Sequence, residues 1–324
     1  MNVLVTGGTG YLGQAVVRAL AARGHNLVIV ARSATRSGLP GTLIDGDVRD
    51  RAALDRAARG CDAFVHAAAL VSIWRRRRQD FDDVNVGGLH NVLAVAAACK
   101  PQRILYTSSF LALAPRDAPS PLEANDYQRT KVAADRVADQ AVASGNPLVR
   151  VYPGVVYGPG AFTEGNLVGR LIADHVHRRL PGVIGPENLW SYSYIDDVAS
   201  GHCAALEQGV PGRRYLLGGE NATQAQMFAI VQRLTGRPQP RRIPFPMAMA
   251  LGAAEELRVR VFGGTPLVTR GAVDIFRHDW SLDSSLAIRE IGYSMTPLDE
   301  GVRRTVASIR IPEGTQRPQR PQRI

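Results

Sequence analysis

The sequence predicts an α/β fold in which helices cover both faces of a parallel sheet and a smaller α/β lobe follows. The first observation is an apolar strand at residues 3–6 that ends in a glycine-rich turn and leads into an amphipathic helix. The second is the alternation of apolar runs and helical segments up to about residue 160, which is typical of right-handed βαβ units. Together they indicate a doubly wound, Rossmann-type sheet.

Further strands of this sheet are expected at residues 27–31, 63–69, 104–109 and 148–151. Beyond residue 160 prolines and glycines multiply and the alternation becomes irregular. We therefore predict a Rossmann domain at 1–160, a substrate-binding lobe at 161–311, and a return of 186–200 to the first domain. Residues 312–324 carry Gln-Arg-Pro repeats without apolar periodicity and are predicted to form a disordered tail.

Composition places the chain among ordinary globular proteins, with 45% hydrophobic and 21% charged residues. The formal net charge is +10, but the arginines are scattered and lack interleaved aromatic residues, which argues against a nucleic-acid groove. Cys61, Cys99 and Cys203 lie too far apart for a metal site and fit a reducing, cytoplasmic location. No leader is expected before a strand that begins at Asn2. The apolar segment 247–254 is too short to span a bilayer and is expected to be a core or lid helix, with contact at a membrane interface as the alternative.

The glycine-rich turn predicts a dinucleotide site. Gly7, Gly10 and Gly13, with Tyr11 and Leu12 between them, let backbone amides approach a pyrophosphate at a helix N-terminus. The small residues Ala67, Ala68 and Ala69 at the end of a later strand are expected to pass beneath the same cofactor.

The second strand ends in Ala31 and Arg32. A carboxylate at this position would accept a hydrogen bond from a ribose 2′-hydroxyl and would repel a 2′-phosphate. A guanidinium binds phosphate through paired hydrogen bonds, so Arg32 favours NADP(H), although a solvated surface arginine is the alternative. Asp47, next to Val48, either accepts from the adenine amino group or caps the helix that follows. His66 is interpreted as a buried structural histidine.

Three residues supply candidate chemistry. Tyr127 and Lys131 are four positions apart on a predicted helix, so their side chains share one face. An ammonium beside the phenol is expected to lower the tyrosine pKa toward the working range. Ser109, at the end of the preceding strand, can hold a substrate oxygen while Tyr127 exchanges its proton.

These motifs, in this order, resemble the extended short-chain dehydrogenase/reductases. The resemblance covers nearly the whole chain and is carried by 6–13, 46–48, 66–69, 85–91, 107–109, 127–131, 153–159, 194–199 and 283–293. It implies that Tyr127 is the proton donor or acceptor, that Lys131 also binds the nicotinamide ribose, and that Ser109 polarises the substrate oxygen. It further implies that Thr107 lies near the cofactor, that Pro153, Val155 and Val156 lie against the nicotinamide, and that the protein forms a homodimer.

Departures from the family pattern narrow the subclass. Phe110 and Leu111 follow Ser109 where dehydratases of the family carry an Asp-Glu pair, so elimination is not expected. Trp190 stands where sugar-nucleotide epimerases carry an arginine. The sequence pattern resembles that of dihydroflavonol reductases, 3β-hydroxysteroid dehydrogenases and hopanoid-associated epimerase-like proteins. The candidate substrate-binding residues are Ser72, Trp74, Asn166, Trp190 and Tyr192.

The leading hypothesis is therefore an NADP(H)-dependent enzyme that reduces a ketone, or oxidises a secondary alcohol, of a largely apolar small molecule, with no metal. Asn166, Leu167 and Arg170 resemble the sugar-nucleotide pattern, so an epimerase with tightly bound NAD(P) is the first alternative. A non-catalytic, NADP-sensing binding protein is the second.

Overall fold

The computed structural model describes residues 1–309, so the tail expected at 312–324 lies outside the described residues. A seven-stranded, fully parallel sheet forms its centre, in the order β3-β2-β1-β4-β5-β6-β9. Its strands are β1 (Asn2–Thr6), β2 (Asn26–Ala31), β3 (Thr42–Asp45), β4 (Ala63–His66), β5 (Arg103–Thr107), β6 (Leu148–Pro153) and β9 (Arg214–Leu217). This arrangement confirms the predicted Rossmann-type fold.

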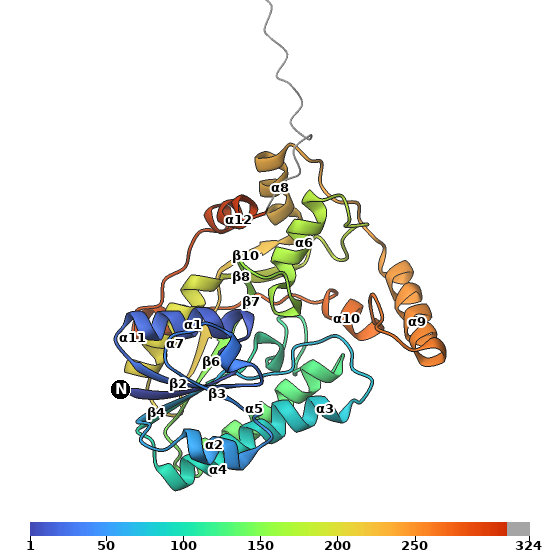
Figure 1. Ribbon diagram of the computed structural model, residues 1–324. Coiled ribbons are helices and arrows are strands. Elements are labelled where there is room, and N and C mark those ends of the chain that lie inside the picture. Colours follow the sequence, from blue (N-terminus) through green and yellow to red (C-terminus); the bar gives the residue numbers. More distant parts are fainter. Residues whose placement is uncertain (310–324) are drawn as a thin grey trace, which may run out of the picture.

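The strands are apolar on both faces because each face is covered by helices. Val3 and Val5 of β1 pack into the core on one face, whereas Leu4 packs into the core on the other. The first face carries α1 (Tyr11–Ala22), α7 (Ile195–Gln208) and α11 (Ser285–Ile291). The second carries α2 (Arg51–Ala57), α4 (Gly87–Cys99) and α5 (Asp126–Ala143), as Figure 1 shows.

A smaller lobe lies over the carboxyl ends of the sheet strands (Figure 1). Its three-stranded sheet has the order β10-β8-β7, with β7 and β8 parallel and β10 antiparallel to β8. Aromatic side chains fill its core, including Tyr157, Tyr192, Trp190 and Trp280. The lobe comprises β7 (Val155–Tyr157), α6 (Leu167–Val176), β8 (Leu189–Tyr194), β10 (Glu220–Thr223), α8 (Gln224–Thr235), α9 (Phe245–Phe262), α10 (Arg270–Ile275) and α12 (Leu298–Ala307).

The division between the two parts differs from the predicted one. The expected return of 186–200 is split, because β8 belongs to the small sheet and buries Trp190 and Tyr192 in the lobe core. The chain returns instead through α7 and β9, and again through α11, which packs on α7. The lobe sequence thus crosses to the Rossmann domain twice, and the first return begins at Ile195 and extends beyond the predicted 186–200.

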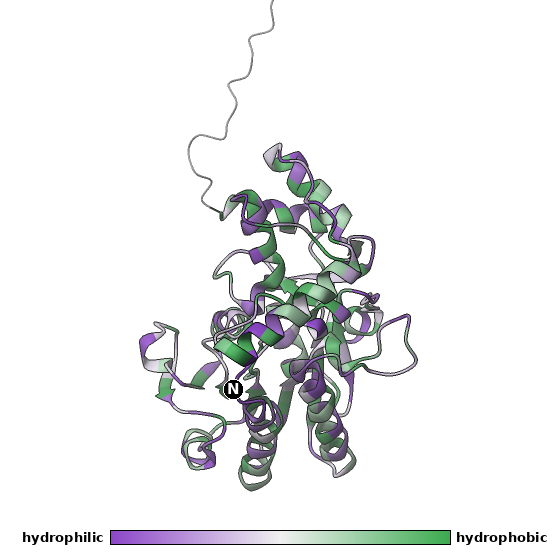
Figure 2. Ribbon diagram, turned by 90° about the vertical axis from the view of Figure 1, so that its right-hand side faces the viewer, coloured by the Kyte–Doolittle hydropathy of each residue, from purple (hydrophilic) through white to green (hydrophobic). Residues whose placement is uncertain are grey.

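The apolar segment 247–254 also differs from the prediction of a core or lid helix. It belongs to the longer helix α9, which buries only Ala248, Gly252 and Val259 and exposes most of its large apolar side chains. Figure 2 is a ribbon view from this side of the molecule, coloured by the hydropathy of each residue. Within residues 1–309, no helix is both long and apolar enough to cross a membrane.

Candidate active site

A cavity of about 510 Å³ lies between the carboxyl edge of the large sheet and the lobe. It brings together Ser109, Tyr127 and Lys131 with every residue predicted to contact the cofactor. Those cofactor candidates are Gly7, Gly10, Tyr11, Leu12, Gly13, Arg32, Asp47, Val48, Ala67, Ala68, Ala69, Thr107, Pro153, Val155 and Val156.

The glycine turn of this cavity has no room for side chains. Gly7 has φ +77°, and a Cβ there would lie 2.5 Å from Cα of Ala68. A Cβ on Gly13 would collide with the carbonyl oxygen of Gly7. Helix α1 begins after Gly10 without a side-chain cap, so its first amides remain available to an anion in the cavity. The turn therefore fits the pyrophosphate of a dinucleotide.

The ends of β2 and β3 form the adenosine side of the cavity. Arg32 lies in its wall, exposed and without an ion-pair partner among residues 1–309. Asp47 instead accepts two hydrogen bonds from the Arg49 guanidinium, at 2.9 and 2.8 Å, which hold the pKa of its carboxyl below the usual range. The helix cap is Asp50, which accepts from the amide of Ala53, so the alternative role of Asp47 as a cap is wrong.

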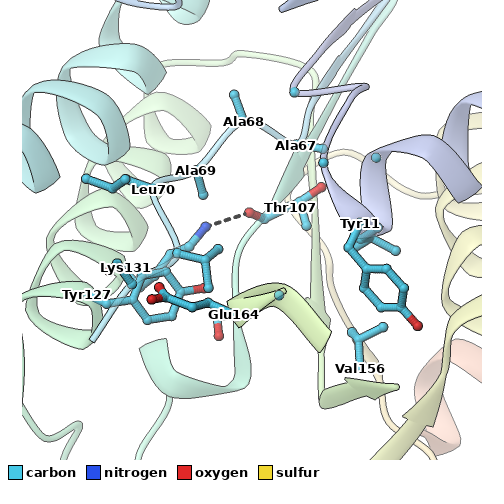
Figure 3. Close-up of a pocket in the computed structure, with 18 of the residues that line it drawn as sticks. Tyr11, Ala67, Ala68, Ala69, Leu70, Thr107, Tyr127, Lys131, Val156 and Glu164 are labelled. Carbon is cyan, nitrogen blue, oxygen red and sulfur yellow. Dashed lines mark hydrogen bonds between the residues drawn. The ribbon is translucent and has the colours of Figure 1, made fainter. Parts of the chain in front are cut away.

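The catalytic candidates come from α5 and from the segment that follows β5. Figure 3 shows Tyr127 and Lys131 of α5. Nζ of Lys131 donates a hydrogen bond to the carbonyl oxygen of Thr107 at 3.1 Å and lies 5.4 Å from the centre of the Tyr106 ring. Ser109 is buried just beyond the end of β5, and Tyr127 precedes Lys131 by one helical turn. The ammonium is thus held against the sheet, beneath the cavity.

The protonation states differ from the expectation of a lowered tyrosine pKa. Burial raises the pKa of Tyr127 to about 12, and the neighbouring Ser109 hydroxyl offsets only part of that effect. Burial also lowers the pKa of Lys131 to about 8, against the opposite influence of the Asp135 carboxylate. Because desolvation disfavours both charged forms, Tyr127 stays protonated at neutral pH.

Two residues outside the predicted set position this chemistry. Gln128, fully buried, donates to the carbonyl oxygen of Leu111 and accepts from the amide of Ala124. It thereby ties the segment after Ser109 to the catalytic helix. Asn85 accepts from the amide of Leu70 at 2.7 Å and donates to Oγ1 of Thr130, which joins the loop after β4 to α5.

The buried histidines are structural. His66 Nδ1 lies 2.7 Å from Oγ1 of Thr6, and burial lowers its pKa to about 3. His202 donates from Nδ1 to the carbonyl oxygen of Val198 and lies 3.0 Å from Oγ1 of Thr107. Burial lowers the pKa of His202 to about 4, so both rings are neutral at physiological pH.

The substrate end of the cavity is mostly apolar. Ser72 and Trp190 lie in its wall as predicted, but Trp74, Asn166 and Tyr192 do not. Asn166 caps α6 and donates to the carbonyl oxygen of Gly158, and Tyr192 is buried in the lobe core. The sequence reasoning did not include five further side chains that line the cavity, namely Phe110, Leu111, Ala272, Ile275 and Phe276.

Two charged side chains interrupt this apolar wall, Glu164 and Arg170. Neither has an ion-pair partner in the part of the chain that the structure describes, and Oε2 of Glu164 is enclosed without a hydrogen-bond partner. Figure 3 draws Glu164 beside the cavity together with Tyr127 and Lys131. These charges can orient a polar group of an otherwise apolar ligand. Across residues 1–309 there is no cluster of three metal-ligating side chains.

Comparison with known proteins agrees with this geometry. Residues 3–218 match the model of the NAD dependent epimerase/dehydratase family, so the chain belongs to that family of extended short-chain dehydrogenase/reductases. It is 33% identical over 309 residues to sterol demethylase protein B of Methylococcus capsulatus, covering 90% of this chain and 93% of the relative. It is 30% identical over 338 residues to a 2-alkyl-3-oxoalkanoate reductase of Stenotrophomonas maltophilia, covering 95% and 99%. The solved structure of gox2253 has a TM-score of 0.79 at 28% identity, covering 94% and 97% of the two chains.

Proposed function

We propose that the protein is an NADP(H)-dependent oxidoreductase that reduces a ketone, or oxidises a secondary alcohol, of a largely apolar small molecule. The observation that carries the proposal is that Ser109, Tyr127 and Lys131 meet in the wall of one cavity that also contains the glycine turn. The names of the two relatives support it, because sterols and alkyl oxoalkanoates are largely hydrocarbon.

In the direction of reduction, Tyr127 donates its proton to the substrate carbonyl oxygen. Its pKa of about 12 keeps the phenol protonated before this step. The Ser109 hydroxyl donates a hydrogen bond to the same oxygen. Lys131 would hold the ribose of a bound nicotinamide and, when protonated, would offset negative charge that develops on that oxygen. A bound nicotinamide supplies the hydride for the carbonyl carbon.

The preference for NADP(H) rests on Arg32. Its guanidinium is exposed in the cavity wall and has no ion-pair partner among the described residues. We expect the 2′-phosphate of the adenosine ribose at this position. Asp47 is engaged by Arg49, so its carboxylate is partly neutralised at this end of the cavity. We further propose that the protein forms a homodimer and lies in the cytoplasm. The family resemblance supports the homodimer, and light scattering tests it.

The family description also covers epimerases, so a sugar-nucleotide epimerase with tightly bound NAD(P) is the second candidate. Arg170, uncompensated in the substrate wall, is the observation that favours it. A non-catalytic NADP sensor is a third candidate, which the complete Ser109, Tyr127 and Lys131 set disfavours.

The test is oxidation of NADPH and NADH by the full chain with 2-alkyl-3-oxoalkanoates, steroid ketones and flavonoid ketones. The proposal expects net consumption of NADPH with at least one apolar ketone, and slower consumption of NADH. Retained oxidised cofactor with epimerisation of a sugar nucleotide and no net consumption of NADPH would establish the second candidate instead. Tight binding of NADP without turnover of any substrate would establish the third.

A further inference from the structure

Helix α9 exposes most of its large apolar side chains to solvent. The side chains that face the protein are small or few, namely Ala248, Gly252 and Val259. Large apolar side chains lie on the outer side and in the loop that follows: Met247 is 57% exposed, Leu251 49%, Leu257 60%, Val261 62%, Phe262 83% and Leu267 82%. An exposed apolar patch of this kind marks an interaction surface.

The spacing of these residues makes one continuous stripe. Met247, Leu251, Ala254, Val261 and Phe262 follow one another at helical intervals, so they share one face of α9. The one charge within the stripe, Arg258, is paired with Glu255 at 2.9 Å. Figure 2 looks directly at this side of the molecule.

The surroundings of the stripe are basic. Residues 236–271 contain six arginines and two glutamates, and both glutamates are already paired, Glu255 with Arg258 and Glu256 with Arg270. Arg241 before the helix and Arg260 near its end are exposed and have no ion-pair partner among residues 1–309. A net positive rim around an apolar stripe is complementary to an anionic lipid surface.

The stripe also adjoins the substrate end of the cavity. Gly252 of α9 packs against the backbone of Thr269 and Arg270, at the start of α10. Helix α10 then contributes Ala272 and Ile275 to the cavity wall. A single short helix thus separates the outward apolar face from the apolar pocket.

We propose that α9 and the loop through Leu267 dock this protein on the surface of an anionic lipid bilayer. Phe262 and Leu267 enter the interface, and arginines at the rim contact the headgroups. Docking of two copies through this face would oppose two positive rims and is therefore disfavoured. Residues 310–324 supply only Ile311 and Ile324 as large apolar side chains, so their composition does not suit them to cover the stripe. The inference does not depend on the proposed reaction.

The test is co-sedimentation of the full chain with vesicles of equimolar phosphatidylcholine and phosphatidylglycerol. We expect wild-type protein to bind them, to bind less as salt is raised, and to bind pure phosphatidylcholine weakly. The double variant Phe262→Ser/Leu267→Ser should lose at least about tenfold in partition coefficient. A control variant, Val210→Ser/Ile288→Ser, removes similarly exposed apolar side chains away from α9 and should stay within about twofold of wild type.

Circular dichroism and NADP binding establish that both variants are folded. Failure of the wild type to bind anionic vesicles would overturn the proposal, as would equal binding by the two double variants. A dimer that only Phe262→Ser/Leu267→Ser dissociates, without vesicle binding, would overturn it in favour of a second copy as the occupant.

Discussion

At the scale of single residues, Lys131 sets the pH range of the proposed reaction. Burial lowers its pKa to about 8, whereas the pKa of Tyr127 is raised to about 12, so Tyr127 does not titrate near neutrality. Below about pH 8 Lys131 is a cation, and above it the cation is lost. We therefore predict that kcat for ketone reduction falls as the pH rises through about 8.

Asp135 provides the control for this prediction, because its carboxylate raises the pKa of Lys131. The variant Asp135→Asn should move the fall in kcat to lower pH in the same pH–rate measurement. A profile that is flat between pH 7 and 9, or one that the variant leaves unchanged, would contradict the assignment.

We propose that Arg32 decides the cofactor preference. We predict that Arg32→Ala weakens NADP binding by roughly 10- to 100-fold, the value of a charge-assisted pair of hydrogen bonds, and leaves NAD binding nearly unchanged. Fluorescence titration with each dinucleotide measures this difference. Arg36→Ala is the matched control, since Arg36 is also exposed but contacts Ser33 and does not line the cavity. An equal loss of affinity for both dinucleotides would show that Arg32 does not bind the 2′-phosphate.

Arg170 is expected to bind an acidic group of the substrate. We predict that Arg170→Gln raises KM for a 2-alkyl-3-oxoalkanoate about tenfold or more, with little change in KM for its methyl ester. Steady-state kinetics on the acid and ester measure the difference. An equal rise for both would mean that the guanidinium shapes the pocket without contacting a charge.

The shared position of Ser109, Tyr127 and Lys131 in one cavity wall could be predicted from sequence motifs, because these residues stand near the ends of regular elements. It failed where long-range packing decides position. Asn166 and Tyr192 were interpreted as substrate contacts, but Asn166 donates a hydrogen bond to the carbonyl oxygen of Gly158 and Tyr192 is buried in the lobe core. Ile275 and Phe276, which are distant in sequence, line the cavity instead. Burial, which is not visible in a spacing of four residues, also reversed the expected pKa shift of Tyr127.

At the scale of elements, the turn between β1 and α1 must remain free of Cβ atoms. Gly7 and Gly24 both have positive φ, +77° and +79°, but only a Cβ at Gly7 meets other atoms, in the backbone of Ala67 and Ala68. We predict that Gly24→Ala costs about 1 kcal/mol of unfolding free energy and keeps NADP binding. Gly7→Ala should cost roughly 2 kcal/mol or more and abolish binding.

Urea denaturation and NADP titration measure these effects on stability and binding. Normal NADP affinity in Gly7→Ala would contradict the role assigned to the turn. The strand, turn and helix themselves were predictable, since three glycines and a 3.6-residue periodicity specify them locally. The small sheet was not, because prolines and glycines interrupt the regular alternation beyond residue 160 and β7 has only three residues.

At the scale of the whole molecule, two crossings of the chain hold the lobe over the sheet. Helix α7 packs on α1, and α11 packs on α7, so segments that follow the lobe strands stabilise the Rossmann domain. The cavity between these parts is lined by Tyr127 and Lys131 of α5 and by apolar side chains of α10. These two crossings explain why the return to the Rossmann domain differs from the predicted stretch 186–200.

The most direct test of the central claim is transfer of deuterium to an apolar ketone from NADPH that carries deuterium at both hydrogen positions of C4, followed by mass spectrometry. We predict that the product alcohol carries deuterium at the carbinol carbon. In Tyr127→Phe the transfer rate should fall at least about 100-fold while NADP still binds. Unlabelled product, or a transfer rate that Tyr127→Phe leaves unchanged, would contradict the account.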